Sequence, residues 1–286
     1  MTWIVYALLV ALFSALRGVS SKKSLRSLDE YVVSWFAFFF SGVYILISFL
    51  FIDFPVLGEN FWSVLFLDCL LSATAAVLST KSLLSDMSVS VPMMAFTPLF
   101  MLLTSYLMLG EIPSGSGFIG VIFIVFGSYF LNIKKRKDGW TKPFKVLTKE
   151  EGPRLMLAAA LIWSITANLD KIALQNSSPI FFAMAENILI ATFIFPFAYT
   201  RMRKQQKEIR KEKTHLAMVG ILGTLMVVFQ MLAIQDTLVV YVVAIKRLGI
   251  LISIILGGVI FGEKEIKQKL MGGVIMVIGV LFITIL

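Results

Sequence analysis

The chain is a succession of long apolar stretches separated by short polar breaks. There are ten such stretches, and each is close to the roughly 20 apolar residues that a helix needs to cross a bilayer. The shortest breaks follow the third and the eighth stretch, where a merged or re-entrant segment would change the number. The pattern predicts an all-α polytopic membrane protein with ten transmembrane helices, at about residues 2–20, 32–52, 61–84, 89–109, 116–133, 153–174, 179–199, 216–235, 238–261 and 266–286.

The composition agrees with a membrane environment and argues against metal-dependent and histidine-based catalysis. Of the 286 residues, 58% are hydrophobic and 15% are charged, and the mean hydropathy is +0.90. Soluble domains are about 45–50% apolar and about 25% charged. The single cysteine, Cys69, and the single histidine, His215, leave no intramolecular disulfide, no Cys/His metal site and no histidine-based triad. We therefore expect a protein that is not an enzyme and that has no metal or cofactor.

Basic residues collect in the loops on one side of the predicted bundle. They include the run 134–137 and the stretch 201–213, which we interpret as a solvated helical extension of the seventh span. The opposite loops carry acidic residues such as Glu59 and Asp236. Because cytoplasmic loops hold the excess of Lys and Arg, we expect both termini outside a bacterial-type plasma membrane. Topology and anionic lipid account for the net charge of +9 without a nucleic acid partner.

A short set of residues occurs twice, 152 positions apart, in matching apolar contexts. Gly110, Glu111, Gly120 and Gly127 are repeated as Gly262, Glu263, Gly272 and Gly279. One unit of this repeat contains five spans, and an odd number gives the two copies opposite orientations in the membrane. Inverted repeats of this kind are typical of transporters. The sequence therefore divides into a first repeat (1–133), a basic cytoplasmic linker (134–152) and a second repeat (153–286).

The repeated residues have an architectural interpretation. Gly120 and Gly127 are seven residues apart and share one helix face, where small residues let two backbones approach closely. The same holds for the second pair of glycines. Glu111 and Glu263 precede a predicted helix, whose unpaired N–H groups favour a carboxylate. A gating role for these two acids is the alternative.

The ten spans, the five-plus-five duplication and the Gly-Glu pair before the last span of each half resemble the drug/metabolite transporter superfamily, EamA type. The resemblance covers essentially the whole chain. It implies a transporter, in a superfamily that contains exporters of amino acids and other metabolites, nucleotide-sugar carriers and plastid phosphate translocators. Many members are described with cytoplasmic termini, whereas the charge bias of this chain places both termini outside.

Few polar side chains lie deep within the spans. Four charged residues stand seven to nine positions into spans that start from the same face: Asp68, Glu186, Lys246 and Arg247. At about 1.5 Å per residue this is a depth of about 10–14 Å. Neutral polar residues of the same zone are Asn168, Asn187 and Gln230. Together they predict a polar layer around a central substrate cavity, with Glu186 or Asp68 as the candidate coupling carboxylate.

Lys246 and Arg247 are the candidates for binding an anionic group of the substrate. Arginine pairs with carboxylate or phosphate through two parallel hydrogen bonds, and lysine acts as a point charge. The two side chains are about 100° apart around a helix, so a shared partner needs several oxygens. The structural alternative is that Glu186 and one of these cations form an ion pair that keeps two helices in register.

The string VAIKRLGILI that contains this pair also resembles the Lys-Arg pair that plastid phosphate translocators use for phosphate. Those proteins have a further lysine in the fourth span, at the place that Met94 occupies here, so the resemblance does not establish a phosphate substrate. Pro98 removes an N–H group and frees the carbonyl of Met94, which predicts a kink facing the site. We expect the wall of the site to be apolar, made of Met93, Met94, Phe96, Trp163 and Tyr241.

Further charged residues lie near the ends of spans, and we interpret them as interfacial: Arg17, Lys81, Asp86, Asp170 and Lys171. Arg17 lies near one end of the first span and reaches the headgroups by snorkelling. Asp170 lies near the end of the sixth span, and we expect it at the interface as well.

These observations predict a secondary transporter that moves a small polar or anionic metabolite by alternating access, driven by an ion gradient or by exchange. The alternative is a flippase or translocase for a lipid or a lipid-linked carrier. The expected partners are a small-molecule substrate and membrane lipids; a homodimer is left open. The chain has no Walker motif, and no single span carries the polar stripe of a channel.

Overall fold

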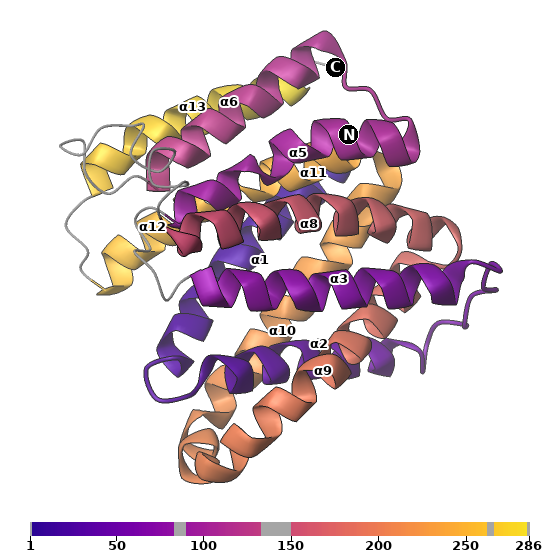
Figure 1. Ribbon diagram of the computed structural model, residues 1–286, viewed down its shortest axis with the longest axis vertical. Coiled ribbons are helices and arrows are strands. Elements are labelled where there is room, and N and C mark those ends of the chain that lie inside the picture. The colour runs from indigo at the N-terminus through magenta and orange to yellow at the C-terminus, as the bar shows by residue number, and fades with distance from the viewer. Residues whose placement is uncertain (1, 83–89, 133–149, 262–265, 285–286) are drawn as a thin grey trace. The chain divides into compact units, whose positions relative to one another are not determined.

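The computed structural model describes residues 2–82, 90–132, 150–261 and 266–284. Helix is the only regular secondary structure among them (Figure 1). The helices are α1 (Thr2–Ser24), α2 (Glu30–Ser48), α3 (Phe61–Ser82), the 3₁₀ helix η1 (Val91–Phe96), α5 (Thr97–Leu109), α6 (Gly115–Asn132), α8 (Glu151–Gln175), α9 (Pro179–Lys204), α10 (Gln206–Asp236), α11 (Val239–Lys246), α12 (Leu248–Phe261) and α13 (Ile266–Thr284).

The chain forms two compact units. The first unit is Met1–Ala73 with Leu169–Gln235, and the second unit is Thr74–Asn168 with Asp236–Leu286. Each unit therefore takes helices from before and after the basic segment 134–152. This division differs from the repeat division that we predict from the sequence, because each unit is defined by contacts in space rather than by chain order.

The all-helical membrane fold is confirmed, but the number of ten spans is not. Six helices of the described part are long and apolar enough to cross a membrane: α1, α2, α3, α8, α9 and α10. Shorter apolar helices cover Met93–Leu109, Gly115–Phe130 and Gly272–Thr284. The predicted ninth span is divided at Arg247 into α11 and α12, and the predicted fourth span begins with η1. Hydropathy detects apolar length, but it does not detect a change of backbone conformation within an apolar stretch.

Close helix packing in the first unit involves small residues. A Cβ atom at Gly42 of α2 would lie 2.6 Å from Cγ1 of Ile188 in α9, so glycine allows the two helices to approach (Figure 1).

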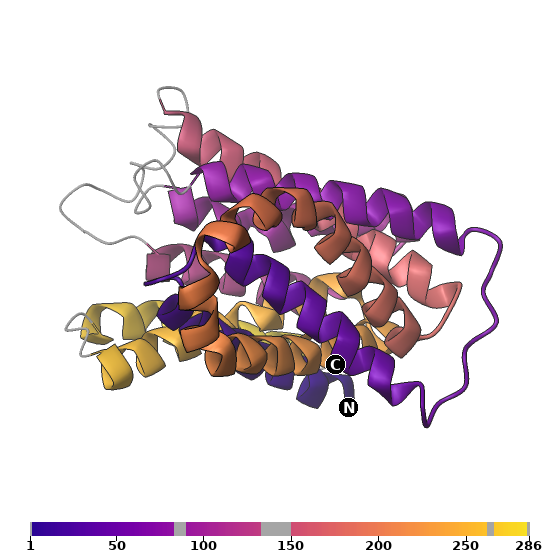
Figure 2. The ribbon, with the colours of Figure 1, turned by 90° about the horizontal axis from the view of Figure 1, so that it is seen from below.

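Side-chain and backbone hydrogen bonds fix the ends of helices in the same unit. Ser178 caps the start of α9 by accepting a hydrogen bond from the Phe181 N–H. The connection between α2 and α3 runs past one end of the helices (Figure 2), and the Gly58 N–H donates to the Asn176 carbonyl at 2.9 Å.

The repeated glycines meet in the second unit, where α6 packs against α13 (Figure 1). A Cβ atom at Gly120 would lie 2.5 Å from the carbonyl oxygen of Gly279, and one at Gly127 would lie 2.6 Å from that of Gly272. The glycines of one repeat therefore face the glycines of the other. Without side chains at these positions the two backbones are in direct contact.

Gly110 and Glu111 join helices in a way that the sequence does not indicate. Gly110 ends α5 with a φ of 68°, a conformation that favours glycine. We expected Glu111 to cap the helix that follows it. Instead its Oε2 accepts a hydrogen bond from the Val239 N–H at 3.0 Å, at the start of α11. That interpretation of Glu111 was wrong because the chain folds α11 against the end of α5; Gly262 and Glu263 lie outside the described residues.

Replacing Glu111 with alanine should destabilise the protein by about 0.5–2 kcal/mol, because an N–H group at a helix start loses its acceptor. Thermal unfolding in detergent measures this effect. Asp53 is an exposed acid of a loop, and Asp53→Ala is the control that should leave the midpoint unchanged. Equal stability of the two variants would contradict the capping role.

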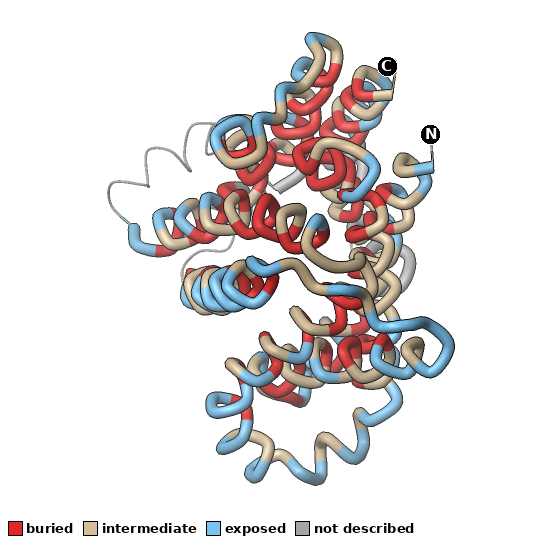
Figure 3. Tube along the Cα trace, turned by 90° about the vertical axis from the view of Figure 1, so that its right-hand side faces the viewer, coloured by how far each residue is buried: buried red, intermediate tan, exposed pale blue. Residues whose placement is uncertain are grey.

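Large apolar side chains remain exposed on the outer faces of the helices. Figure 3 shows buried and exposed positions alternating along each helix, and the exposed positions include Leu8, Phe66, Leu107, Phe126 and Phe197. Apolar patches of this extent on a soluble protein are rare. Together with the helix lengths they identify an integral membrane protein.

The basic stretch 201–213 is helical at both ends. It forms the last turn of α9 up to Lys204 and, after Gln205, the first turns of α10. The expected extension therefore belongs to two helices rather than to one. Asp29 joins this region to α2, because Nε of Arg201 donates to its Oδ2 at 3.1 Å and its own N–H donates to Oε1 of Gln205.

Candidate functional site

The Lys-Arg pair stands at a break between two helices of the second unit. Lys246 is the last residue of α11, and Arg247 forms the turn before α12. The Arg247 N–H donates to the Ala244 carbonyl, and the Arg247 carbonyl accepts from the Ile250 N–H, both at 3.0 Å. These bonds span three residues and not four, so the α-helical pattern is interrupted here. Nε of Arg247 is buried and has no hydrogen-bond partner within the described part of the chain.

The corresponding segment of the first repeat is also irregular. Residue 94 precedes residue 246 by the repeat distance of 152 positions, and it lies in η1. Pro92 and Pro98 stand in the first turns of η1 and α5, where proline is tolerated and the preceding helix cannot continue. In the second unit α11 packs against α5. Irregular backbone at membrane depth occurs where it is buried in protein or lines a wet cavity.

The carbonyl of Met94 is not free, so this part of our prediction was wrong. Both the N–H and Oγ1 of Thr97 donate to it, the latter at 2.9 Å. The 3₁₀ geometry replaces the bond that Pro98 cannot make. The side chain of Met94 packs with Trp163 against a buried cluster of the second unit, made of Met93, Ala95, Tyr129 and Met156. Their role in lining a substrate site stays a prediction.

Tyr241 has a clear structural contact. It is buried, and its hydroxyl accepts a hydrogen bond from the Ser114 N–H at 3.1 Å, just before α6 begins. A Cβ atom at Gly117 would overlap this hydroxyl. The ring therefore rests on the first turn of α6, and contact with substrate is a prediction that the structure leaves untested.

Asn168 belongs to a buried hydrogen-bond network between α8 and α5. Its amide nitrogen donates to Thr104 Oγ1 at 3.0 Å and to the Ser164 carbonyl at 2.7 Å. Its amide oxygen accepts from Ser105 Oγ at 2.7 Å. The network gives Asn168 a role in helix packing that the sequence does not reveal, since its partners Ser105 and Thr104 are 63 and 64 residues away.

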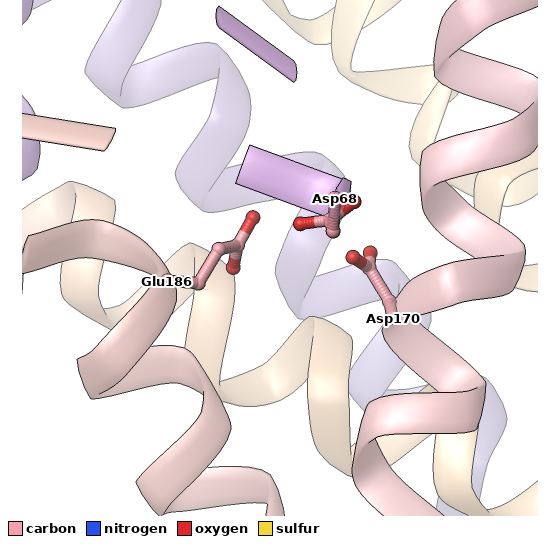
Figure 4. Close-up of side chains that lie close together, drawn as sticks. All are labelled: Asp68, Asp170 and Glu186. Carbon is pink, nitrogen blue, oxygen red and sulfur yellow. The ribbon is translucent and has the colours of Figure 1, made fainter. Parts of the chain in front are cut away.

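Three carboxyl groups come together in the first unit. Asp68 of α3, Asp170 of α8 and Glu186 of α9 each offer an oxygen, and these oxygens lie within 4.8 Å of one another. Figure 4 shows the three side chains pointing toward a common centre. The structure thus brings together two predicted residues, Asp68 and Glu186, with one that we assigned to the interface.

The interfacial interpretation of Asp170 was wrong, because its side chain is only 5% exposed. A signal was present in the sequence. Counted from Gln175, the end of α8, Asp170 is five residues in, whereas Asp68 and Glu186 are seven residues from the starts of α3 and α9. The chain runs through α8 in the direction opposite to α3 and α9. The position of Asp170 therefore has to be counted from the end of α8, and counted so it is similar to that of the other two acids.

Arg17 of α1 is half-buried, and its expected position at the headgroups stays a prediction. Its guanidinium group interacts electrostatically with Glu186. The group also lies 5.4 Å from the centre of the Phe38 ring. An arginine of α1 is therefore one cation within electrostatic range of Glu186, and hydropathy alone does not show which face of α1 it occupies.

Two other predicted site residues of the first unit, Asn187 and Gln230, are also buried. The Asn187 amide donates to the Ala183 carbonyl at 2.8 Å, within α9, and Gln230 of α10 is 8% exposed. The Cys69 thiol, which follows Asp68, donates to the Glu186 carbonyl at 3.9 Å. Their contribution to substrate binding stays a prediction.

The chain was compared with known proteins. A family model described as the EamA-like transporter family matches residues 1–133 and 152–285. One solved crystal structure, described only as that of a protein, is 13% identical and has a TM-score of 0.80, with 99% of this chain and 97% of that chain covered. At this identity the likeness shows the fold alone. No curated protein matches the sequence.

Both matched ranges together span nearly the entire sequence, and they agree with an all-helical membrane protein in which the same apolar pattern occurs twice. The chain belongs to the EamA-like transporter family.

Proposed function

We propose that this membrane transporter carries a small anionic metabolite by alternating access, driven by an ion gradient or by exchange. The observation that carries the proposal is the half-buried side chain of Arg247, whose buried Nε has no hydrogen-bond partner among the described residues, at the break between α11 and α12. Discontinuous helices commonly form the substrate sites of secondary transporters. Family membership supports transport rather than catalysis.

The chemistry of Arg247 favours an anion. A guanidinium stays charged in proteins, and a buried charge is costly unless it is paired. A carboxylate or phosphate group offers two oxygens that match its planar set of donors. Lys246 precedes it directly and adds a second positive charge, which suits a substrate group with several oxygens.

Uptake and counterflow in proteoliposomes test the proposal, with labelled phosphate, phosphoesters, carboxylates and amino acids offered in turn. Arg247→Ala should reduce transport of the anion about 10- to 100-fold, because a hydrogen bond to a charged group contributes about 1.5–3 kcal/mol. Arg154 is exposed near the start of α8, and Arg154→Ala is the matched control that should transport normally.

The outcome separates the alternatives. Loss of anion transport by Arg247→Ala with retained folding supports the proposal. An unchanged KM and rate in this variant would overturn the assignment of Arg247. Movement of a fluorescent phospholipid, without movement of any soluble anion, would instead favour the lipid translocase that the sequence also allows.

The orientation in the membrane belongs to the same proposal. The bias of Lys and Arg toward one set of loops supports both termini outside a bacterial-type plasma membrane. A cysteine introduced at Arg210, in the basic stretch, should be protected from an impermeant maleimide in intact cells, and labelling there would reverse the orientation.

A further inference from the structure

The acidic cluster of the first unit, defined by Asp68, Asp170 and Glu186, has the geometry of a cation site. The three residues come from three different helices, and the ligand oxygens lie within 4.8 Å of one another. Two oxygens bound to the same Ca²⁺ ion at about 2.4 Å are at most about 4.8 Å apart. Three oxygens at this limit lie about 2.8 Å from their common centre, so a small inward movement of the side chains would let a single ion contact all three carboxylates.

Asp68 gives independent evidence for a ligand. Its side chain is completely buried, and neither of its oxygens has a hydrogen-bond partner among the described residues. Figure 4 shows this carboxylate beside those of the two other acids. A buried carboxylate without a donor is expensive. An ion at the centre of the cluster would supply the missing interaction.

The donor set indicates the class of ion. Carboxylate oxygens are hard ligands that suit Mg²⁺, Ca²⁺ and Mn²⁺. The nearby thiol of Cys69 is directed at the backbone carbonyl of Glu186, so it adds no soft ligand to the set. Three carboxylates also favour a divalent over a monovalent cation, since the affinity of oxygen sites rises with the number of ligand charges.

We infer that Asp68, Asp170 and Glu186 together bind one hard divalent cation within the helices of the first unit. Its role as the coupling ion rests on the proposed transport function, whereas the binding itself does not. Arg17 of α1 adds a positive charge within electrostatic range of Glu186.

Binding is measured on the purified full-length protein in detergent, first treated with a chelator that is then removed. The thermal unfolding midpoint is recorded with CaCl₂, MgCl₂ or MnCl₂ and with NaCl at equal ionic strength. A hundredfold excess over Kd should raise the midpoint by roughly 5 °C or more. Electron paramagnetic resonance of Mn²⁺ should give one bound ion per chain.

Asp68→Asn and Asp170→Asn should each remove this rise and the bound Mn²⁺. Both should be at least as stable as the ion-free wild type, because each change relieves repulsion between buried carboxylates. Asp53→Asn, in an exposed loop, should keep the full response. Each variant is expected to be stable without the ion and to lose the stabilisation by the ion. Because two variants are made, the test stays valid if one of them fails to fold.

The inference is overturned if no divalent cation raises the midpoint of the wild type, or if Asp68→Asn responds equally. A protein that binds Mn²⁺ but transports no offered anion would refute the proposed function and leave the site intact. A protein that transports an anion but binds no cation would do the reverse. Transport that requires the divalent cation, and that Asp68→Asn abolishes, would establish the coupling role.

Discussion

Replacing Gly279 with alanine should lower the thermal stability of the protein, although alanine is normally the better helix former. The added Cβ atom would lie 2.6 Å from the Gly120 carbonyl oxygen and 3.0 Å from the Ile124 nitrogen. Both obstacles are backbone atoms of α6, so α6 and α13 have to separate. Overpacking of this kind typically costs about 1–3 kcal/mol. Thermal unfolding in detergent, followed by circular dichroism, measures the change.

The control is a glycine with free space around it. Gly18 in α1 has no atom within 4 Å of the position of an added Cβ. Gly18→Ala should therefore leave stability unchanged or raise it by roughly 0.5–1 kcal/mol through helix propensity. If Gly279→Ala is as stable as Gly18→Ala, the close contact between α6 and α13 does not exist in the membrane protein. Gly120→Ala tests the same contact from the opposite helix.

Asn168→Ala should be the second strongly destabilising substitution. It removes three hydrogen bonds of 2.7–3.0 Å and leaves Ser105 Oγ without its acceptor in a buried position. Hydrogen bonds between transmembrane helices contribute about 0.6 kcal/mol on average and up to about 1.7 kcal/mol. With the cavity left by the side chain, we expect a loss of about 2–3 kcal/mol.

Transport kinetics decide whether Asn168 also contacts the substrate. If it only joins α8 to α5, KM measured per folded protein should be unchanged in Asn168→Ala. Thr192 makes a local bond to the Ile188 carbonyl on an exposed helix face, and Thr192→Ala is the control for removal of a hydrogen bond without loss of packing. A raised KM together with normal stability would restore Asn168 to the substrate site.

The two proposals use different chemistry in different parts of the chain. Arg247 offers a half-buried cation at a break in the backbone, and Asp68 offers a buried carboxylate within a continuous helix. A transporter that couples the movement of an anion to that of a cation needs both kinds of group. The variants proposed for each site change one of them at a time, so their effects on transport and on ion binding can be compared directly.

The apolar pattern alone was sufficient to predict a helical membrane protein and most of its helices. Backbone groups in lipid have to be satisfied internally, so a long apolar stretch has almost no option except helix. The same reasoning identified the repeated glycines as small residues in packing faces. It did not reveal that α11 ends at Lys246, since a turn at Arg247 leaves the hydropathy of the stretch unchanged.

The sequence by itself determined the class of protein, because long apolar stretches identify membrane helices, and it indicated that Asp68 and Glu186 stand at similar positions along their helices. Depth placed Asp68 and Glu186 in one layer. Only the tertiary structure decided which of these charges are neighbours. It added Asp170 to the acidic cluster and brought Arg17 within electrostatic range of Glu186, because the rotation of a helix about its axis and the choice of its partners depend on packing between side chains far apart in the chain.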